Sequence, residues 1–262
     1  MTRIHELIVY RNFENGQILE DMAWIFDHAG SEYYNEEDLR GLYYECIHGL
    51  VDLAGTHGFE GNLWHTYLTY LLVNNENAFS TASEIRGEIS GSINELAYHD
   101  FEIFKELYDF DFGAVEKPLE TSCYAMIADY KGSDDQGKMF NKRIRDRICE
   151  LSRRLGSTES IDEFKKDMSE FYKDFGVGKL GLHKAFRVAH DEDGVHIVPI
   201  TKIAHVHLSD LVGYEAAKKK LIDNTEAFVE GRPANNCLLF GDAGTGKSTS
   251  IKGILNEYYD RG

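Results

Sequence analysis

The chain has 262 residues, of which 42% are hydrophobic and 28% are charged, and its formal net charge at pH 7 is −17. This length suits one large domain or two smaller ones, and no apolar run approaches the roughly 18 residues of a membrane span. Residues 1–16 lack the apolar core of a secretion signal. The four cysteines are scattered without a C-x-x-C pair, so we expect reduced thiols, no membrane segment and a cytoplasmic location.

The negative charge is concentrated in the first half of the chain. Residues 1–137 contain 26 Asp and Glu against 7 Lys and Arg, whereas residues 138–262 contain 19 against 21. An acidic surface repels polyanions, which argues against nonspecific nucleic-acid binding by this half. The charge favours a solvated helical surface or, less strongly, a surface for a basic partner.

Residues 1–179 are predicted to form an acidic, mostly helical domain. Residues 92–110 begin with Ser92 and Glu95 at the spacing of a capping box, and residues 160–176 repeat this device with Ser160 and Glu163. Apolar side chains in both segments recur at spacings of three and four residues, the period of an amphipathic helix. Further helices are predicted over residues 16–30, 35–58, 61–75, 79–90 and 136–156.

Residues 180–208 differ from the helical part in their pattern of polar and apolar residues. They alternate in polarity, are rich in β-branched residues and contain Asp193-Gly194 between two strand-like runs. This pattern is typical of a β-hairpin, so we interpret the segment as a β-containing connector.

Residues 209–262 predict a helix, a strand and a second helix. Ser209 or Asp210 can cap a helix that ends at Gly231. The run NNCLLF over residues 235–240 is typical of a buried parallel strand, and the apolar positions between residues 251 and 258 have helical spacing.

The sequence GDAGTGKS, residues 241–248, lies between that strand and that helix and follows the pattern G-x-x-x-x-G-K-[ST]. Its glycines let successive backbone N–H groups converge on phosphate oxygens, and the following helix directs its positive dipole end at the same charge. Lys247 is predicted to reach the β- and γ-phosphates and Ser248 to coordinate Mg²⁺ through its hydroxyl. These two are the candidate catalytic residues, and Ser248 is the candidate metal ligand.

A D-L-V-G-Y-E box at residues 210–215 precedes the loop by about thirty residues. With this box, the loop and the segments WHTYLTYLLVNNENAFS and ILNEYYDRG, the chain resembles an uncharacterised bacterial family of AAA+-type ATPases, densely over residues 206–262 and more loosely before. The resemblance implies that ATP and Mg²⁺ are the cofactors and that the box lines an adenine pocket. The implied nucleotide-binding residues are Leu211, Val212, Gly213 and Tyr214 of the box, and Gly241, Asp242, Ala243, Gly244, Thr245, Gly246, Lys247, Ser248 and Thr249 of the loop.

The fold expected is a mainly α N-terminal helical domain, a short β-hairpin connector and, over residues 209–262, the beginning of an α/β P-loop (AAA+) domain. Family members continue into an acidic metal-binding strand, sensor residues and an arginine finger, which these 262 residues lack. We therefore expect an N-terminal portion of an ATPase that by itself hydrolyses ATP negligibly.

The resemblance implies that the parent protein couples ATP hydrolysis to the remodelling of an unknown protein partner, which the helical domain recruits, and that it can form homo-oligomers. The alternative interpretation is a non-enzymatic, acidic helical binding module whose phosphate loop is vestigial. The loop supports the first interpretation, and the absence of the remaining ATPase elements supports the second.

Overall fold

The computed structural model describes residues 2–132, 142–178, 185–191, 194–200, 203–204 and 206–259. The chain divides into two compact units, Met1–His183 and Lys184–Gly262. The boundary expected after residue 179 falls among residues 179–184, which lie outside the described ranges. The hairpin and the phosphate loop thus belong to the same unit, and each unit is described by itself.

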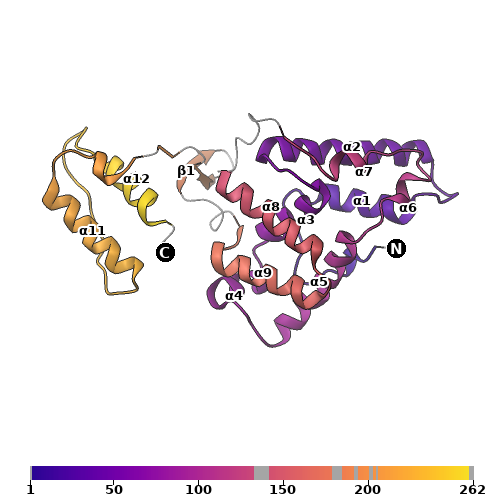
Figure 1. Ribbon diagram of the computed structural model, residues 1–262, viewed down its shortest axis with the longest axis horizontal. Coiled ribbons are helices and arrows are strands. Elements are labelled where there is room, and N and C mark those ends of the chain that lie inside the picture. The colour runs from indigo at the N-terminus through magenta and orange to yellow at the C-terminus, as the bar shows by residue number, and fades with distance from the viewer. Residues whose placement is uncertain are drawn as a thin grey trace. The chain divides into compact units, whose positions relative to one another are not determined.

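The first unit is helical, as the sequence pattern predicted (Figure 1). Each predicted segment contains a helix whose ends lie within a few residues of the expected ones, except that the beginning of the 136–156 segment falls outside the described residues. The short elements η1 (Ile4–Glu6), α6 (Gly113–Glu116) and α7 (Tyr124–Ile127) were not predicted. The longer helices are α1 (Gln17–His28), α2 (Glu36–His57), α3 (Leu63–Asn74), α4 (Ala78–Arg86), α5 (Ser92–Tyr108), α8 (Lys142–Ser157) and α9 (Ile161–Phe175).

Helix α3 lies at the centre of this unit and packs against α2, α5 and α8. Its sequence is apolar on every side, and nearly all its residues are buried, as expected of a helix surrounded by others. Trp64 is fully buried, and its indole Nε1 donates a hydrogen bond to the carbonyl of Leu107 at 2.9 Å. His65 donates through Nε2 to the carbonyl of Tyr108, and burial lowers the pKa of this imidazole.

The two predicted capping boxes have different outcomes. The predicted capping box at Ser92 is not present, because Gly91 is the N-cap of α5 and Ser92 is already the first residue of the helix. At α9, Ser160 accepts a hydrogen bond from the Glu163 backbone N–H, as predicted. The Glu163 carboxylate, however, accepts from the backbone N–H of Glu159 rather than from that of Ser160.

A buried carboxylate binds the backbone of residues 8–10 to the helices of this unit. Asp100 of α5 is completely buried, and its oxygens accept hydrogen bonds from the backbone N–H groups of Ile8, Val9 and Tyr10 at distances from 2.7 to 3.1 Å. The Tyr10 hydroxyl lies 3.0 Å from that of Tyr172, which donates to the carbonyl of Leu72. These bonds join the N-terminal segment to α5, α9 and α3.

The second unit begins with an antiparallel hairpin of β1 (Phe186–Asp191) and β2 (Gly194–Pro199), in which Asp191 pairs with Gly194. The predicted hairpin is confirmed, although Asp193 of the expected turn lies outside the described residues. The unit continues with η2 (Leu208–Asp210), α11 (Glu215–Val229) and α12 (Lys247–Tyr258). In the described parts of the chain, no helix is both long and apolar enough to cross a membrane.

Replacement of Asp100 by asparagine is expected to lower the free energy of unfolding by about 2–3 kcal/mol, because the amide presents an N–H₂ group to backbone donors and leaves some of them unpaired. Urea unfolding followed by tryptophan emission measures this change, since Trp24 and Trp64 both lie in the helical unit. Asp52→Asn on the exposed side of α2 is the matched control and is expected to cost less than about 0.5 kcal/mol. Equal effects of the two variants would contradict the structural role of Asp100.

Candidate functional site

Helix α11 forms one wall of the candidate site. It begins after Tyr214, which adopts the left-handed conformation at φ 57°, so the predicted cap at Ser209 or Asp210 is wrong. Those two residues belong to η2, where the Asp210 carboxylate accepts a hydrogen bond from the His207 backbone N–H. The helix ends as predicted near Gly231, whose positive φ of 68° turns the chain away from the axis.

Residues 235–240 follow α11, and the start of this segment is hydrogen-bonded to the helix. The Asn224 side chain donates to the Asn235 carbonyl and accepts from the Asn235 backbone N–H, both at 2.8 Å. This reciprocal pair fixes the start of the segment against the helix.

The buried parallel strand expected over residues 235–240 is not present in the structure. The segment has no strand hydrogen bonds, and Leu238 and Phe240 are 84% and 85% exposed. A strand is defined by ladder bonds to a neighbour, and in the described part of the chain the sheet contains only β1 and β2. The α/β domain expected from the sequence is therefore not confirmed.

The glycine loop bends sharply between this segment and α12. Gly241, Gly244 and Gly246 have positive φ angles of 139°, 79° and 78°, a region that side-chain-bearing residues rarely adopt. Thr245 donates through its hydroxyl to the Asp242 carbonyl at 2.8 Å. The Lys247 ammonium folds over the loop and donates to the carbonyls of Gly241 and Asp242 at 2.9 and 2.6 Å.

The D-L-V-G-Y-E box meets the loop through Leu211. A Cβ atom at Gly246 would lie 3.0 Å from Leu211 Cδ2, so a larger residue there would require a small shift of the Leu211 side chain in addition to strain at the positive φ angle. The Leu211 carbonyl accepts a hydrogen bond from Lys218 Nζ at 2.7 Å, which ties the box to the first turns of α11. Leu208 of η2 is buried, and its backbone N–H donates to Glu257 of α12.

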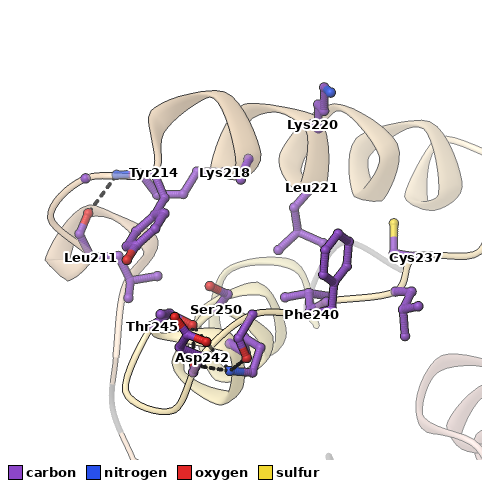
Figure 2. A pocket seen from close by; sticks show the side chains of 16 residues that line it. Leu211, Tyr214, Lys218, Lys220, Leu221, Cys237, Phe240, Asp242, Thr245 and Ser250 are labelled. Carbon is purple, nitrogen blue, oxygen red and sulfur yellow. Dashed lines mark hydrogen bonds between the residues drawn. The ribbon is translucent and has the colours of Figure 1, made fainter.

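These segments enclose a pocket of about 630 Å³. Figure 2 shows Lys218 and Leu221 of α11 on one wall, and Phe240, Asp242, Thr245 and Ser250 on the other, whereas the Lys220 side chain extends from the outer side of α11, away from the pocket. Seven of the predicted site residues line it: Leu211, Gly213, Tyr214, Gly241, Asp242, Thr245 and Lys247. The box and the loop, which are far apart in sequence, thus contribute to the same pocket.

Six predicted residues do not line the pocket: Val212, Ala243, Gly244, Gly246, Ser248 and Thr249. Val212 is 94% exposed, and Ser248 lies exposed on the first turn of α12.

Sequence reasoning missed the wall that α11 contributes through Ala217, Lys218, Lys220 and Leu221. The EAAKKKL run was assigned only to a helix. Its small residues and lysines, placed just after the box, are the signal that could have identified it. Ser250 was also missed, and its hydroxyl bonds to the Gly246 carbonyl of the loop at 2.9 Å.

The charged residues at the pocket are mostly lysines. Among the described residues lining it, Lys218, Lys220 and Lys247 are basic and Asp242 is the one acid. Lys218 and Lys247 donate to backbone carbonyls, and the Lys220 side chain points away from the cavity (Figure 2). Within the described ranges, no protein acceptor bonds to the backbone N–H groups of residues 243–249. A turn of unpaired N–H groups at the start of a helix can bind a phosphate or carboxylate.

Metal binding by side chains alone finds no support in this unit. No cluster of three or more His, Cys, Asp or Glu side chains suited to a metal ion occurs in the part of the chain that the structure describes. A Mg²⁺ ion at Ser248 would therefore need oxygens from a ligand and water, as Mg²⁺ commonly does with nucleotide phosphates.

Comparison with known proteins gives one family match. Residues 181–262 match the family described as "Protein of unknown function (DUF815)". No curated protein and no solved structure matches the chain. The matched residues include the hairpin, the box, α11, the loop and α12, so the second unit is similar to an uncharacterised protein family.

Proposed function

We propose that the Lys184–Gly262 unit binds ATP in this pocket and is the phosphate-binding part of an AAA+-type ATPase. The observation that carries the proposal is the meeting of two distant motifs: the Leu211–Tyr214 box and the Gly241–Ser248 loop line one cavity. A cavity of about 630 Å³ is within the usual range for sites that bind a ligand of this size.

The triphosphate binds across the loop and the start of α12. The open N–H groups of residues 243–249 donate to phosphate oxygens, and the positive end of the α12 dipole adds to the attraction. Lys247 exchanges its bonds to the Gly241 and Asp242 carbonyls for stronger bonds to the β- and γ-phosphates. The Ser248 hydroxyl would be the protein ligand of Mg²⁺, which would neutralise phosphate charge when bound with the nucleotide.

The base occupies the more apolar part of the pocket. Leu211 and Leu221 present aliphatic surface, and Tyr214 and Phe240 supply aromatic rings (Figure 2). These side chains offer a purine an apolar surface and aromatic faces for stacking. Tyr214 is the N-cap residue of α11 and also lines the pocket.

Removal of the Lys247 ammonium by Lys247→Ala is expected to weaken ATP binding by about tenfold or more, because a charge-assisted bond to phosphate is worth about 1.5–3 kcal/mol. Titration of the full chain with a fluorescent ATP analogue in the presence of Mg²⁺ measures the dissociation constant. Lys252→Ala is the matched control, since Lys252 is exposed on the same helix and does not line the pocket. If both variants bind equally well, or if the unmodified chain does not bind, the vestigial-loop alternative is supported instead.

Cys237 provides a second probe of the same pocket. It is exposed and lines the cavity, whereas Cys46 and Cys123 are buried and burial raises the pKa of the Cys149 thiol. Iodoacetamide is expected to alkylate Cys237 first, and saturating Mg·ATP to slow this reaction several-fold. Peptide mass spectrometry at timed intervals follows each thiol separately. Protection that is unchanged in Lys247→Ala would show that the nucleotide occupies another site.

The 262-residue chain is expected to hydrolyse ATP negligibly despite binding it. Positioning and charge stabilisation supply most of the rate in phosphoryl transfer, and Asp242 is the one carboxylate that the described residues bring to the pocket. A coupled assay for phosphate release compares the chain with its Lys247→Ala variant. Steady release that this substitution abolishes would refute the expectation.

The wider role of the protein rests on the resemblance rather than on the pocket. We propose that ATP hydrolysis by the parent ATPase remodels a protein partner, that the acidic helical unit recruits this partner, and that the parent protein acts as a homo-oligomer in the cytoplasm. Independent helical packing in the Met1–His183 unit supports a separate recruiting role.

A further inference from the structure

The helical unit carries an exposed cluster of aromatic rings. Trp24 and His28 lie one turn apart on α1, and Tyr34 lies in the loop that leads to α2. The Trp24 ring is 3.9 Å from that of His28 and 5.4 Å from that of Tyr34, measured between centroids. Trp24 is nevertheless 46% exposed, and the neighbouring Tyr33 is almost fully exposed. We call Trp24, His28, Tyr33 and Tyr34 the aromatic cluster.

Local hydrogen bonds hold this cluster in place. The His28 ring bonds through Nδ1 to the Trp24 carbonyl at 2.7 Å, which aligns the two rings along α1. The Ser31 backbone N–H donates to the His28 carbonyl, and the Tyr34 backbone N–H donates to the Ser31 carbonyl. The Tyr34 ring meets both Trp24 and His28 edge to face. A preorganised group of rings loses little conformational entropy when it binds a partner.

The surroundings of the cluster are strongly acidic. Residues 12–39 contain eight acidic residues and no lysine or arginine. Glu20 and Asp21 lie one turn before Trp24 on α1, and Glu32, Glu36, Glu37 and Asp38 are exposed beside Tyr33 and Tyr34. The residues that flank this range, Arg11 and Arg40, are basic.

We infer that the aromatic cluster is a docking surface for a cationic peptide segment, rich in arginine or lysine, of a partner protein. Exposed indole and phenol faces attract guanidinium and ammonium groups through cation–π contacts, and the acidic rim supplies long-range attraction and steering. Trp, Tyr and Arg are also the residues that dominate binding energy at protein interfaces. The inference concerns the helical unit alone and does not require nucleotide binding.

Fluorescence anisotropy of a fluorescein-labelled decapeptide of alternating arginine and glycine tests this surface on the full chain without nucleotide. The peptide is expected to bind at least tenfold more tightly than its serine–glycine counterpart. Trp24→Ala, which leaves the net charge unchanged, is expected to weaken binding about fivefold, the value of one cation–π contact. Ile85→Ala is the control, because Ile85 is an exposed apolar residue on α4 outside the cluster.

Acrylamide quenching of tryptophan emission gives a second measurement. Trp64 is fully buried, so the accessible emission comes from Trp24, and the arginine peptide is expected to reduce its quenching. Equal peptide affinities of Trp24→Ala and Ile85→Ala would reduce the interaction to general charge attraction and overturn the inference. Self-association of the chain that Trp24→Ala abolishes would assign the cluster to a second copy and overturn it as well.

Discussion

A buried backbone N–H group must find an acceptor, and this requirement determines how the N-terminal residues of the helical unit are held. In the helical unit, Asp100 meets it for three successive residues at the N-terminus. Without this carboxylate the segment around Tyr10 could not be buried at acceptable cost, because each unpaired buried donor costs about 1–3 kcal/mol. The Tyr10–Tyr172–Leu72 chain of bonds then extends the same connection to α9 and α3.

In the second unit, the backbone N–H groups of the glycine loop are not paired in this way. Gly241, Gly244 and Gly246 turn the backbone, and the N–H groups at the start of α12 have no protein acceptors among the described residues. Lys247 and Thr245 instead donate to carbonyls of the loop. Donors that are open to solvent and close to lysines suit an anionic ligand, and the proposed ATP site follows from this arrangement.

The charge distribution separates two kinds of partner. Among the charged residues lining the pocket, three lysines stand against one aspartate, whereas residues 12–39 contain eight acidic residues and no lysine or arginine. A nucleotide suits the first surface and a cationic peptide suits the second. The two proposed ligands would therefore not compete for the same charges.

Local patterns in the sequence determined most of the secondary structure and the position of the loop, since helical periodicity and glycine spacing depend on near neighbours alone. They could not choose between Gly91 and Ser92 as a helix cap, or place the start of α11 at Tyr214, because both choices depend on packing. The apolar run at residues 235–240 showed strand character, but a strand needs a partner that distant residues must supply. Only the tertiary structure brought Leu211 against Gly246 and Lys218 into the same pocket as Lys247, because such contacts arise when segments far apart in sequence pack together.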